Sequence, residues 1–219
     1  MEKYTLLFFN GASGSGKTRF ITDRIPAGLF YNLRSATTRK MRKDESEGKP
    51  YFFRDEEYFE TTPLATHLWV NEAFWKPGDE KWKYGVPEFE IIDHLGCNFI
   101  YDVIEPKYAR QMWDWFVKNK LDSEYTYKIA WFIPPTDSKN TVKQRANMKD
   151  DEKVRDINTC NIEDFLDVGM RPDYILRPIK TETSPSFIDP QLMRYIDVLY
   201  DDMVRRQSKP QYPPRSNKR

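Results

Sequence analysis

The chain has 219 residues, which is enough for one hydrophobic core with a small inserted subdomain. It carries 35 Lys and Arg residues against 34 Asp and Glu residues, a formal net charge of +1. This balance gives no electrostatic case for a duplex nucleic acid or an anionic membrane as the main partner. No run approaches 18 consecutive apolar residues, so we expect no membrane-spanning helix.

The cysteine content and the amino-terminal segment indicate in which cellular compartment the protein is expected. Cys97 and Cys160 lack the paired spacing of metal ligands, so we expect reduced thiols and no metal cluster. The first residues, MEKYTLLFF, lead directly into an apolar strand pattern and lack the features of a signal peptide. We therefore expect a cytoplasmic protein that is a monomer or a homodimer.

The first motif lies between a predicted strand (3–10) and a predicted helix. Residues 11–18 read GASGSGKT, which fits the phosphate-loop pattern Gly, any four residues, Gly-Lys-Ser/Thr. Its glycines let backbone N–H groups point inward at an anion, and the following helix adds its positive dipole end. Lys17 would reach the β- and γ-phosphates of a nucleoside triphosphate, and the Thr18 hydroxyl would ligate Mg²⁺. The predicted nucleotide-binding residues are Gly11, Ala12, Ser13, Gly14, Ser15, Gly16, Lys17 and Thr18.

A second informative segment follows a short predicted strand at 27–33. Residues 35–53 read SATTRKMRKDESEGKPYFF and bring together arginines, hydroxyls and aromatic rings. Guanidinium groups bind the oxygens of a phosphate monoester bidentately, and a tyrosine hydroxyl can complete such a cage. Judged on charge alone, the segment also fits a solvated loop.

Together with the phosphate loop, this segment resembles the monophosphate-binding segment of guanylate kinases. The matching residues are Thr37, Thr38, Arg39, Arg42, Glu45, Gly48, Tyr51 and Phe53. Ser35 falls where that family has a base-contacting serine, and Tyr84 falls where it has a second phosphate-contacting tyrosine. The resemblance implies that Arg39, Arg42, Tyr51 and Tyr84 clamp the phosphate of an acceptor nucleotide.

The base-reading positions depart from the family pattern. The family has a hydroxyl residue after the glycine that follows Tyr84, and this chain has Val86. The family also has a guanine-contacting acid two residues after Asp102, where this chain has Ile104. Its base-reading glutamate has no clean counterpart, and Glu72 is the nearest candidate.

The second half of the chain alternates predicted strands and helices. Strands are expected at 97–106, 126–135 and 172–178, and amphipathic helices at 106–120 and 189–206. Asp102 resembles the family aspartate that lies at a strand end, near the phosphates and Mg²⁺. The polar segment 137–161 resembles a mobile lid, in which Arg145 and Arg155 fall near the family's lid arginines, with Lys149 a third candidate.

These elements predict an α/β fold with right-handed crossovers. We expect a P-loop NTPase core with a parallel sheet flanked by helices, an inserted small mixed-strand nucleoside-monophosphate-binding subdomain and a helical lid. The expected boundaries are 1–32 and 92–206 for the core, 33–91 for the subdomain, 136–160 for the lid and 207–219 for a disordered tail.

The resemblance implies an ATP-dependent nucleoside monophosphate kinase that uses Mg²⁺. Lys17, Arg145 and Arg155 would surround the transferred phosphate, while Thr18 and Asp102 place Mg²⁺. GMP or dGMP is the acceptor that the family implies. Val86 and Ile104 leave open a pyrimidine or modified deoxynucleotide such as dUMP or dTMP, because a base site discriminates through its polar groups.

Two other functions compete with this interpretation. Guanylate-kinase-like scaffold domains bind phosphopeptides through the same cage, but typically with a degraded phosphate loop. Here Lys17 and Thr18 are both present, which favours an enzyme. A kinase acting on a base or sugar within DNA, or on another small acceptor, is the third hypothesis, and the near-neutral net charge counts against it.

Overall fold

The computed structural model describes most of the chain. The described residues are 3–11, 15–41, 43, 45–69, 82–103, 105–133, 162–176, 178–179, 186–187 and 189–208.

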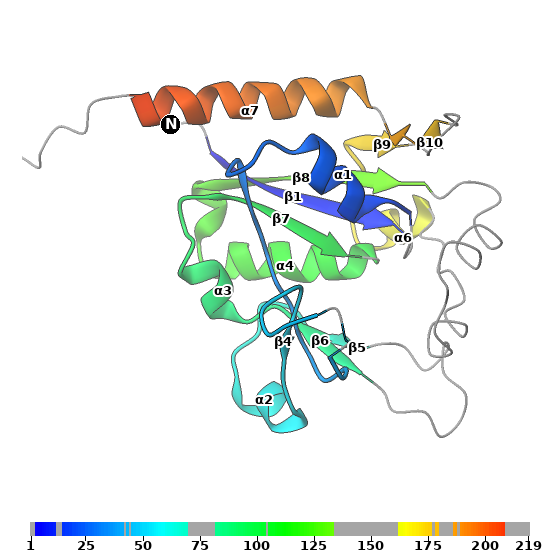
Figure 1. Ribbon diagram of the computed structural model, residues 1–219, viewed down its shortest axis with the longest axis vertical. Coiled ribbons are helices and arrows are strands. Elements are labelled where there is room, and N and C mark those ends of the chain that lie inside the picture. The colour runs from blue at the N-terminus through cyan, green and yellow to red at the C-terminus, as the bar shows by residue number, and fades with distance from the viewer. Residues whose placement is uncertain are drawn as a thin grey trace, which may run out of the picture.

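A five-stranded parallel sheet forms the centre of the molecule, with the strand order β2-β7-β1-β8-β9 (Figure 1). β1 is buried from Thr5 to Gly11, as expected for an apolar run that is central in a parallel sheet. Because the strands are parallel, their carboxyl ends meet at one edge, where β1 leads into the phosphate loop. The strands are β1 (Tyr4–Gly11), β2 (Phe30–Asn32), β7 (Asn98–Val103), β8 (Tyr125–Phe132) and β9 (Tyr174–Leu176).

Helices cover both faces of this sheet (Figure 1). Helices α1 and α7 pack on one face, where Phe20 and Leu192 join a buried cluster. Helices α4 and α6 pack on the other, where Phe116 and Phe165 are fully buried. Trp115 and Phe116 are thus packing residues of the core, as their helical spacing predicts. The bounds are α1 (Lys17–Arg24), α4 (Pro106–Lys118), α6 (Ile162–Asp167) and α7 (Pro190–Ser208).

A small mixed sheet is inserted between β2 and β7, on the α4 side of the main sheet (Figure 1). Its order is β4-β3-β6-β5, with β3 parallel to β4 and antiparallel to β6. Asp55 caps α2 by accepting a hydrogen bond from the Tyr58 backbone N–H at 3.0 Å. The elements are β3 (Ala36–Thr37), β4 (Phe52–Phe53), α2 (Glu56–Thr61), β5 (Leu68–Trp69), β6 (Lys83–Gly85) and α3 (Glu88–Ile92). The remaining elements are η2 (Leu121–Ser123) and the antiparallel pair β10 (Pro178–Ile179) and β11 (Ser186–Phe187).

The two chain crossings between the sheets are joined by an ion pair whose carboxylate is buried and whose guanidinium is partly exposed. Arg34, on the way out to β3, donates from Nε to Glu90 Oε1 at 2.7 Å and from a terminal nitrogen to Glu90 Oε2 at 3.1 Å. Glu90 lies in α3, on the way back, and is 1% exposed. It also accepts from the Tyr31 hydroxyl at 2.9 Å, while the Arg34 guanidinium stacks over the Phe52 ring at 4.6 Å. This junction fixes where the inserted sheet starts and ends.

The predicted fold class is confirmed by the parallel sheet, its flanking helices and the small mixed sheet. β2 is shorter than the predicted 27–33 because Gly28, at φ +79°, lies in a turn closed by the Leu29 N–H to the Pro26 carbonyl. Helix α7 extends two residues beyond the predicted end at Arg206. The lid and residues 209–219 of the tail lie outside the described residues, and the domain boundaries stay a prediction.

Two features are absent from the described part of the chain. No helix in it is long and apolar enough to cross a membrane. In the same residues, no three His, Cys, Asp or Glu side chains gather in a way that could hold a metal ion.

Candidate functional site

The described ends of the phosphate loop form a crowded cradle at the carboxyl end of β1. A β-carbon on Gly11 would lie 2.6 Å from the Phe132 carbonyl oxygen, so only glycine fits at this position. Gly16, at φ +97°, turns the chain into α1. The Ser15 hydroxyl is buried and has no hydrogen-bond partner within the described residues. Ala12, Ser13 and Gly14 lie outside those residues.

Lys17 connects this cradle with the end of β7. Its ammonium donates to the Gly11 carbonyl at 2.7 Å and lies 3.6 Å from Asp102 Oδ1. The Lys17 side chain is 7% exposed, whereas that of Asp102 is 32% exposed. Desolvation raises the pKa of the Asp102 carboxyl, and the nearby Lys17 ammonium opposes that shift. Thr18, in the first turn of α1, is exposed and accessible to a ligand.

The second group of predicted residues lies on the inserted sheet. Arg39 is 4% exposed, and one of its terminal nitrogens donates to both Glu45 carboxylate oxygens, at 2.7 and 2.9 Å. The other terminal nitrogen donates to the Lys40 carbonyl at 2.8 Å. The Arg39 guanidinium lies 5.4 Å from the Tyr51 ring, which itself lies 5.6 Å from the Tyr84 ring. The structure therefore brings together Arg39, Tyr51 and Tyr84. Arg42 lies outside the described residues.

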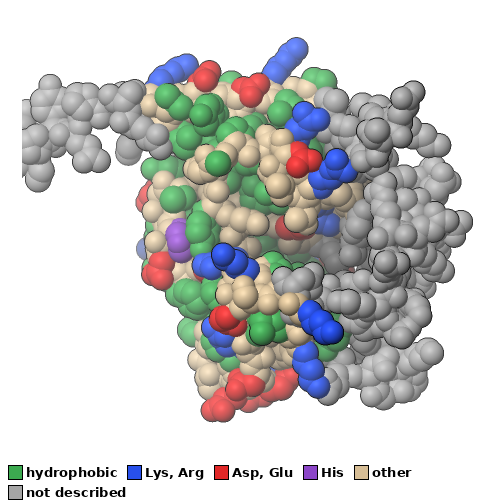
Figure 2. Space-filling view, viewed as in Figure 1, with side chains coloured by type: hydrophobic (Ala, Val, Ile, Leu, Met, Phe, Trp, Pro, Cys, Tyr) green, Lys and Arg blue, Asp and Glu red, His purple; other side chains and the backbone are tan. Residues whose placement is uncertain are grey.

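The register of the inserted sheet places Tyr84 in this group. Tyr84, in β6, pairs with Thr37 of β3, two residues before Arg39. The Thr38 N–H donates to the Lys83 carbonyl, and the Lys83 N–H donates to the Thr38 hydroxyl. The Lys83 ammonium forms an ion pair with Glu56 of α2. Acidic side chains gather at the lower tip of the molecule, where α2 lies, and a hollow separates this part from the larger part above it (Figure 2).

Ser35 and Tyr101 lie next to the two groups along the chain. Ser35 lies in the crossing that leads to Arg39, and its side chain is among the groups that lower the pKa of the Tyr101 hydroxyl, against the larger rise that burial causes. Tyr101 directly precedes Asp102 in β7. The same Tyr101 hydroxyl lies 3.2 Å from the Thr66 hydroxyl, which also accepts from the Val86 N–H at 3.1 Å. Sequence analysis missed Tyr101 and Thr66, because a tyrosine in an apolar strand is typical of core packing.

Several predicted residues are not placed. Arg145, Arg155 and Lys149, in the predicted lid, lie outside the described residues, and so do Glu72 and Ile104. Within the described part, the predicted residues fall into a phosphate-loop group (Gly11, Ser15, Gly16, Lys17, Thr18, Asp102) and an arginine–tyrosine group (Arg39, Tyr51, Tyr84), with Ser35 between them.

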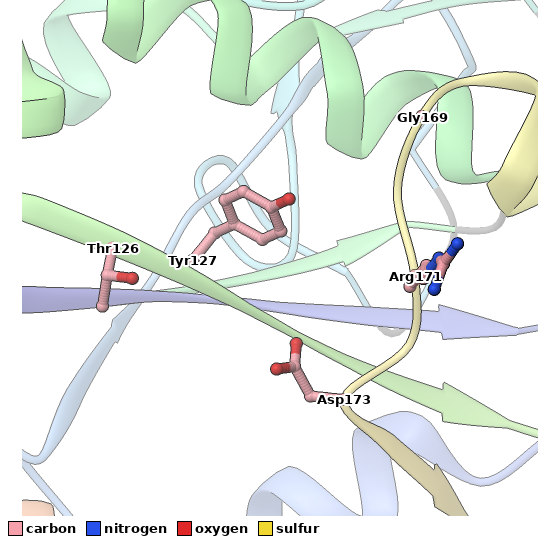
Figure 3. A pocket seen from close by; sticks show the side chains of 5 residues that line it. All are labelled: Thr126, Tyr127, Gly169, Arg171 and Asp173. Carbon is pink, nitrogen blue, oxygen red and sulfur yellow. The ribbon is translucent and has the colours of Figure 1, made fainter.

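A separate hollow lies at the opposite half of β8 (Figure 3). The Asp173 carboxylate there accepts from the Lys128 ammonium at 2.8 Å and from the Ile129 N–H at 2.9 Å. Asp173 thereby joins the segment just before β9 to β8. This hollow adjoins the start of β8, whereas Gly11 pairs with Phe132 at the strand's end, so the hollow is distinct from the candidate site. Its lining residues are Thr126, Tyr127, Gly169, Arg171 and Asp173.

Comparison with known proteins finds similar kinases, although no family model matches the chain. The guanylate kinase of Mycoplasma pneumoniae is 32% identical over 154 residues, which cover 68% of this chain and 58% of that protein. The guanylate kinase of Carboxydothermus hydrogenoformans is 26% identical over 221 residues, covering 94% of this chain and 100% of that protein. The chain thus spans just over half of the first relative and the whole of the second. The crystal structure of guanylate kinase from Anaplasma phagocytophilum is similar with a TM-score of 0.45 and 17% identity, over 95% of this chain and 88% of that one.

Proposed function

Because this chain is a divergent member of the guanylate kinase-like P-loop family, we propose that it is a nucleoside monophosphate kinase. It would transfer the γ-phosphate of ATP to a nucleoside or deoxynucleoside monophosphate. The observation that carries the proposal is the Lys17–Asp102 pair, which joins the phosphate-loop lysine to the end of β7 at the carboxyl edge of the sheet.

The residues present fit a nucleotide's phosphates. Lys17 is a buried cation held at the mouth of the cradle by the Gly11 carbonyl, so it is ready to pair with an anion. The buried Ser15 hydroxyl, which has no partner in the described part of the chain, would gain one from a phosphate oxygen. Gly11 has no β-carbon, which lets the start of the loop lie against the Phe132 backbone and beside the Ser15 hydroxyl.

Mg²⁺, when bound with ATP, would neutralise charge on the β- and γ-phosphates during transfer. Thr18 and Asp102 are the residues that would hold it, since both are accessible and offer oxygen ligands. Lys17 would bind the oxygens of the transferred phosphoryl group. On sequence grounds alone, we propose that Arg145 and Arg155 neutralise the negative charge of the same group.

The arginine–tyrosine group suits the acceptor phosphate. Arg39 is an always-charged fork whose orientation is set by Glu45, and such a fork binds phosphate oxygens bidentately. Tyr51 and Tyr84 add hydroxyl donors from β4's preceding turn and from β6, and Arg42 is proposed as a second arginine. A phosphate fixed in this way would be held in line with the γ-phosphate of ATP, which supplies most of the catalysis in phosphoryl transfer.

We propose GMP or dGMP as the acceptor, on the strength of the guanylate kinase relatives. The test is an ADP-release assay with ATP and Mg²⁺ against the common ribo- and deoxyribonucleoside monophosphates. Turnover with GMP or dGMP is expected, and Lys17→Ala should reduce it by about 100-fold or more, because the variant loses the cation that neutralises the transferred charge. A melting temperature for Lys17→Ala close to that of the wild type shows that the loss is chemical. Absence of Lys17-dependent turnover with every acceptor would overturn the proposal.

A further inference from the structure

Arg34 lies where the chain leaves the main sheet for the inserted sheet, and its side chain contacts elements on both sides of this crossing. Its guanidinium donates to the Tyr31 hydroxyl of β2 at 2.7 Å and to Glu90 of α3 at 2.7 Å. The Arg34 backbone N–H donates to the same Glu90 oxygen at 3.2 Å. Toward the inserted sheet, the guanidinium lies over the Phe52 ring of β4, 4.6 Å from its centre. One side chain therefore joins β2, α3 and β4.

β4 connects Arg34 with the arginine–tyrosine group, because successive side chains of a strand point to opposite faces. Phe52 faces Arg34. Its two neighbours, Tyr51 and Phe53, face Arg39, whose guanidinium lies 5.4 and 5.6 Å from the centres of their rings. A displacement of Phe52 relative to Arg34 would therefore move Tyr51 and the surroundings of Arg39 as well.

The inserted sheet maintains the shape of the arginine–tyrosine group through its own backbone. The Phe52 N–H donates to the Ser35 carbonyl at 3.0 Å, and the Arg54 N–H donates to the Thr37 carbonyl at 2.9 Å. These bonds fix distances within the inserted sheet. The position of the group relative to the phosphate loop depends instead on contacts between the two sheets, and those of Arg34 reach β4 directly.

We propose that Arg34 is a positioning residue for phosphoryl transfer, which holds the arginine–tyrosine group where the acceptor phosphate lies in line with the γ-phosphate of ATP. It acts through Glu90, in the helix that lies between the two sheets (Figure 1), and through Phe52. The inference rests on the proposed kinase function. A displacement of about 1 Å in a reacting group costs about 100-fold in rate, so a contact that sets this distance acts on kcat.

The test variant is Arg34→Met, which keeps a long side chain against Phe52 and loses the hydrogen bonds to Glu90. With the nucleoside monophosphate that the wild type phosphorylates fastest, kcat should fall by about tenfold to 100-fold. The Kd of that acceptor, measured calorimetrically without ATP, and the KM for ATP should stay within about twofold, because a lost alignment affects the transition state alone. Arg34→Lys keeps the charge without the planar fork, so its kcat should be intermediate.

The matched control for Arg34→Met is Arg54→Met. The Arg54 guanidinium also lies over the Phe52 ring, at 5.6 Å, but its ion pair is with Glu47 of the same inserted segment. Because this pair does not join the two sheets, Arg54→Met should leave kcat within about twofold of the wild type.

A second variant separates positioning from a loss of stability. Arg34→Met combined with Glu90→Leu leaves neither charge without its partner, so its melting temperature should exceed that of Arg34→Met alone. Its kcat should nevertheless stay as low, because an apolar contact has no preferred direction and cannot replace the oriented hydrogen bonds.

The outcomes are distinct. The inference is overturned, and the kinase function stands, if Arg34→Met keeps the kcat of the wild type or loses no more than Arg54→Met does. It is also overturned if kcat recovers together with the melting temperature in the double variant, or if weaker acceptor binding accounts for the whole loss of activity. A wild type without turnover on any nucleoside monophosphate would overturn the proposed function, and the inference with it.

Discussion

Replacing Arg39 by alanine should lower kcat/KM for the acceptor nucleotide by about 30- to 3,000-fold and leave the KM for ATP within about twofold. Arg39 is a 4% exposed guanidinium whose fork is oriented by Glu45, so its loss removes the charge-assisted hydrogen bonds proposed to hold the acceptor phosphate in line with the γ-phosphate of ATP. The measurement is a steady-state analysis in which the acceptor and ATP are varied separately.

Two variants show whether the geometry of Arg39 matters beyond its charge. Arg39→Lys keeps the charge but loses the planar fork, so its activity should lie between those of Arg39→Ala and the wild type. Glu45→Gln keeps the shape of the carboxylate but weakens the bond that orients Arg39, and it should raise the acceptor KM more than it lowers kcat. If Arg39→Ala binds and phosphorylates the acceptor as the wild type does, the assignment of this group to the acceptor phosphate is wrong.

Removing Glu90 should have the largest effect on stability. Glu90→Ala leaves the Arg34 guanidinium, which is 36% exposed, and the Tyr31 hydroxyl without their shared acceptor, and losing such charge-assisted hydrogen bonds costs about 2–3 kcal/mol. For a chain of this size we expect the melting temperature to fall by about 5–10 °C. Thermal unfolding followed by circular dichroism measures this change.

The matched control for Glu90→Ala is Glu60→Ala in α2. Glu60 is an exposed glutamate, so its removal should change stability by no more than about 0.5 kcal/mol. The double variant Arg34→Met with Glu90→Leu should recover part of the loss, because replacing both partners leaves neither charge without its partner. Equal melting temperatures for Glu90→Ala and Glu60→Ala would contradict the role of this pair at the junction.

The phosphate loop and the arginine–tyrosine segment could be predicted from sequence because their residues are close together along the chain. Residues 11–18 combine glycines, a lysine and a hydroxyl in a spacing that has few other physical uses. Similarly, Arg39, Glu45 and Tyr51 lie within one short stretch, and the structure brings them into contact. The main strands were predictable for a related reason, since a buried parallel strand leaves a continuous apolar run.

Contacts between distant segments could not be predicted in the same way. They include the hydrogen bonds that Thr66 forms with Tyr101 and Val86, and the Arg34–Glu90 ion pair. Thr66, Val86 and Tyr101 come from three separate segments, and only the pairing of β6 with β3 and the position of β7 bring them together. Glu90 lies in an acidic stretch whose composition is typical of an exposed turn. It is nevertheless buried, because α3 lies between the two sheets and Arg34 reaches it from the other crossing.

The most direct test of the central claim follows the phosphate itself. The protein is incubated with Mg²⁺, ATP labelled at the γ-phosphate and unlabelled GMP or dGMP, and the labelled products are separated by chromatography. The account predicts that the label appears in GDP or dGDP, at a rate that depends on the acceptor concentration and that Lys17→Ala abolishes. Label found in inorganic phosphate alone, or label transfer that does not depend on Lys17, would contradict it.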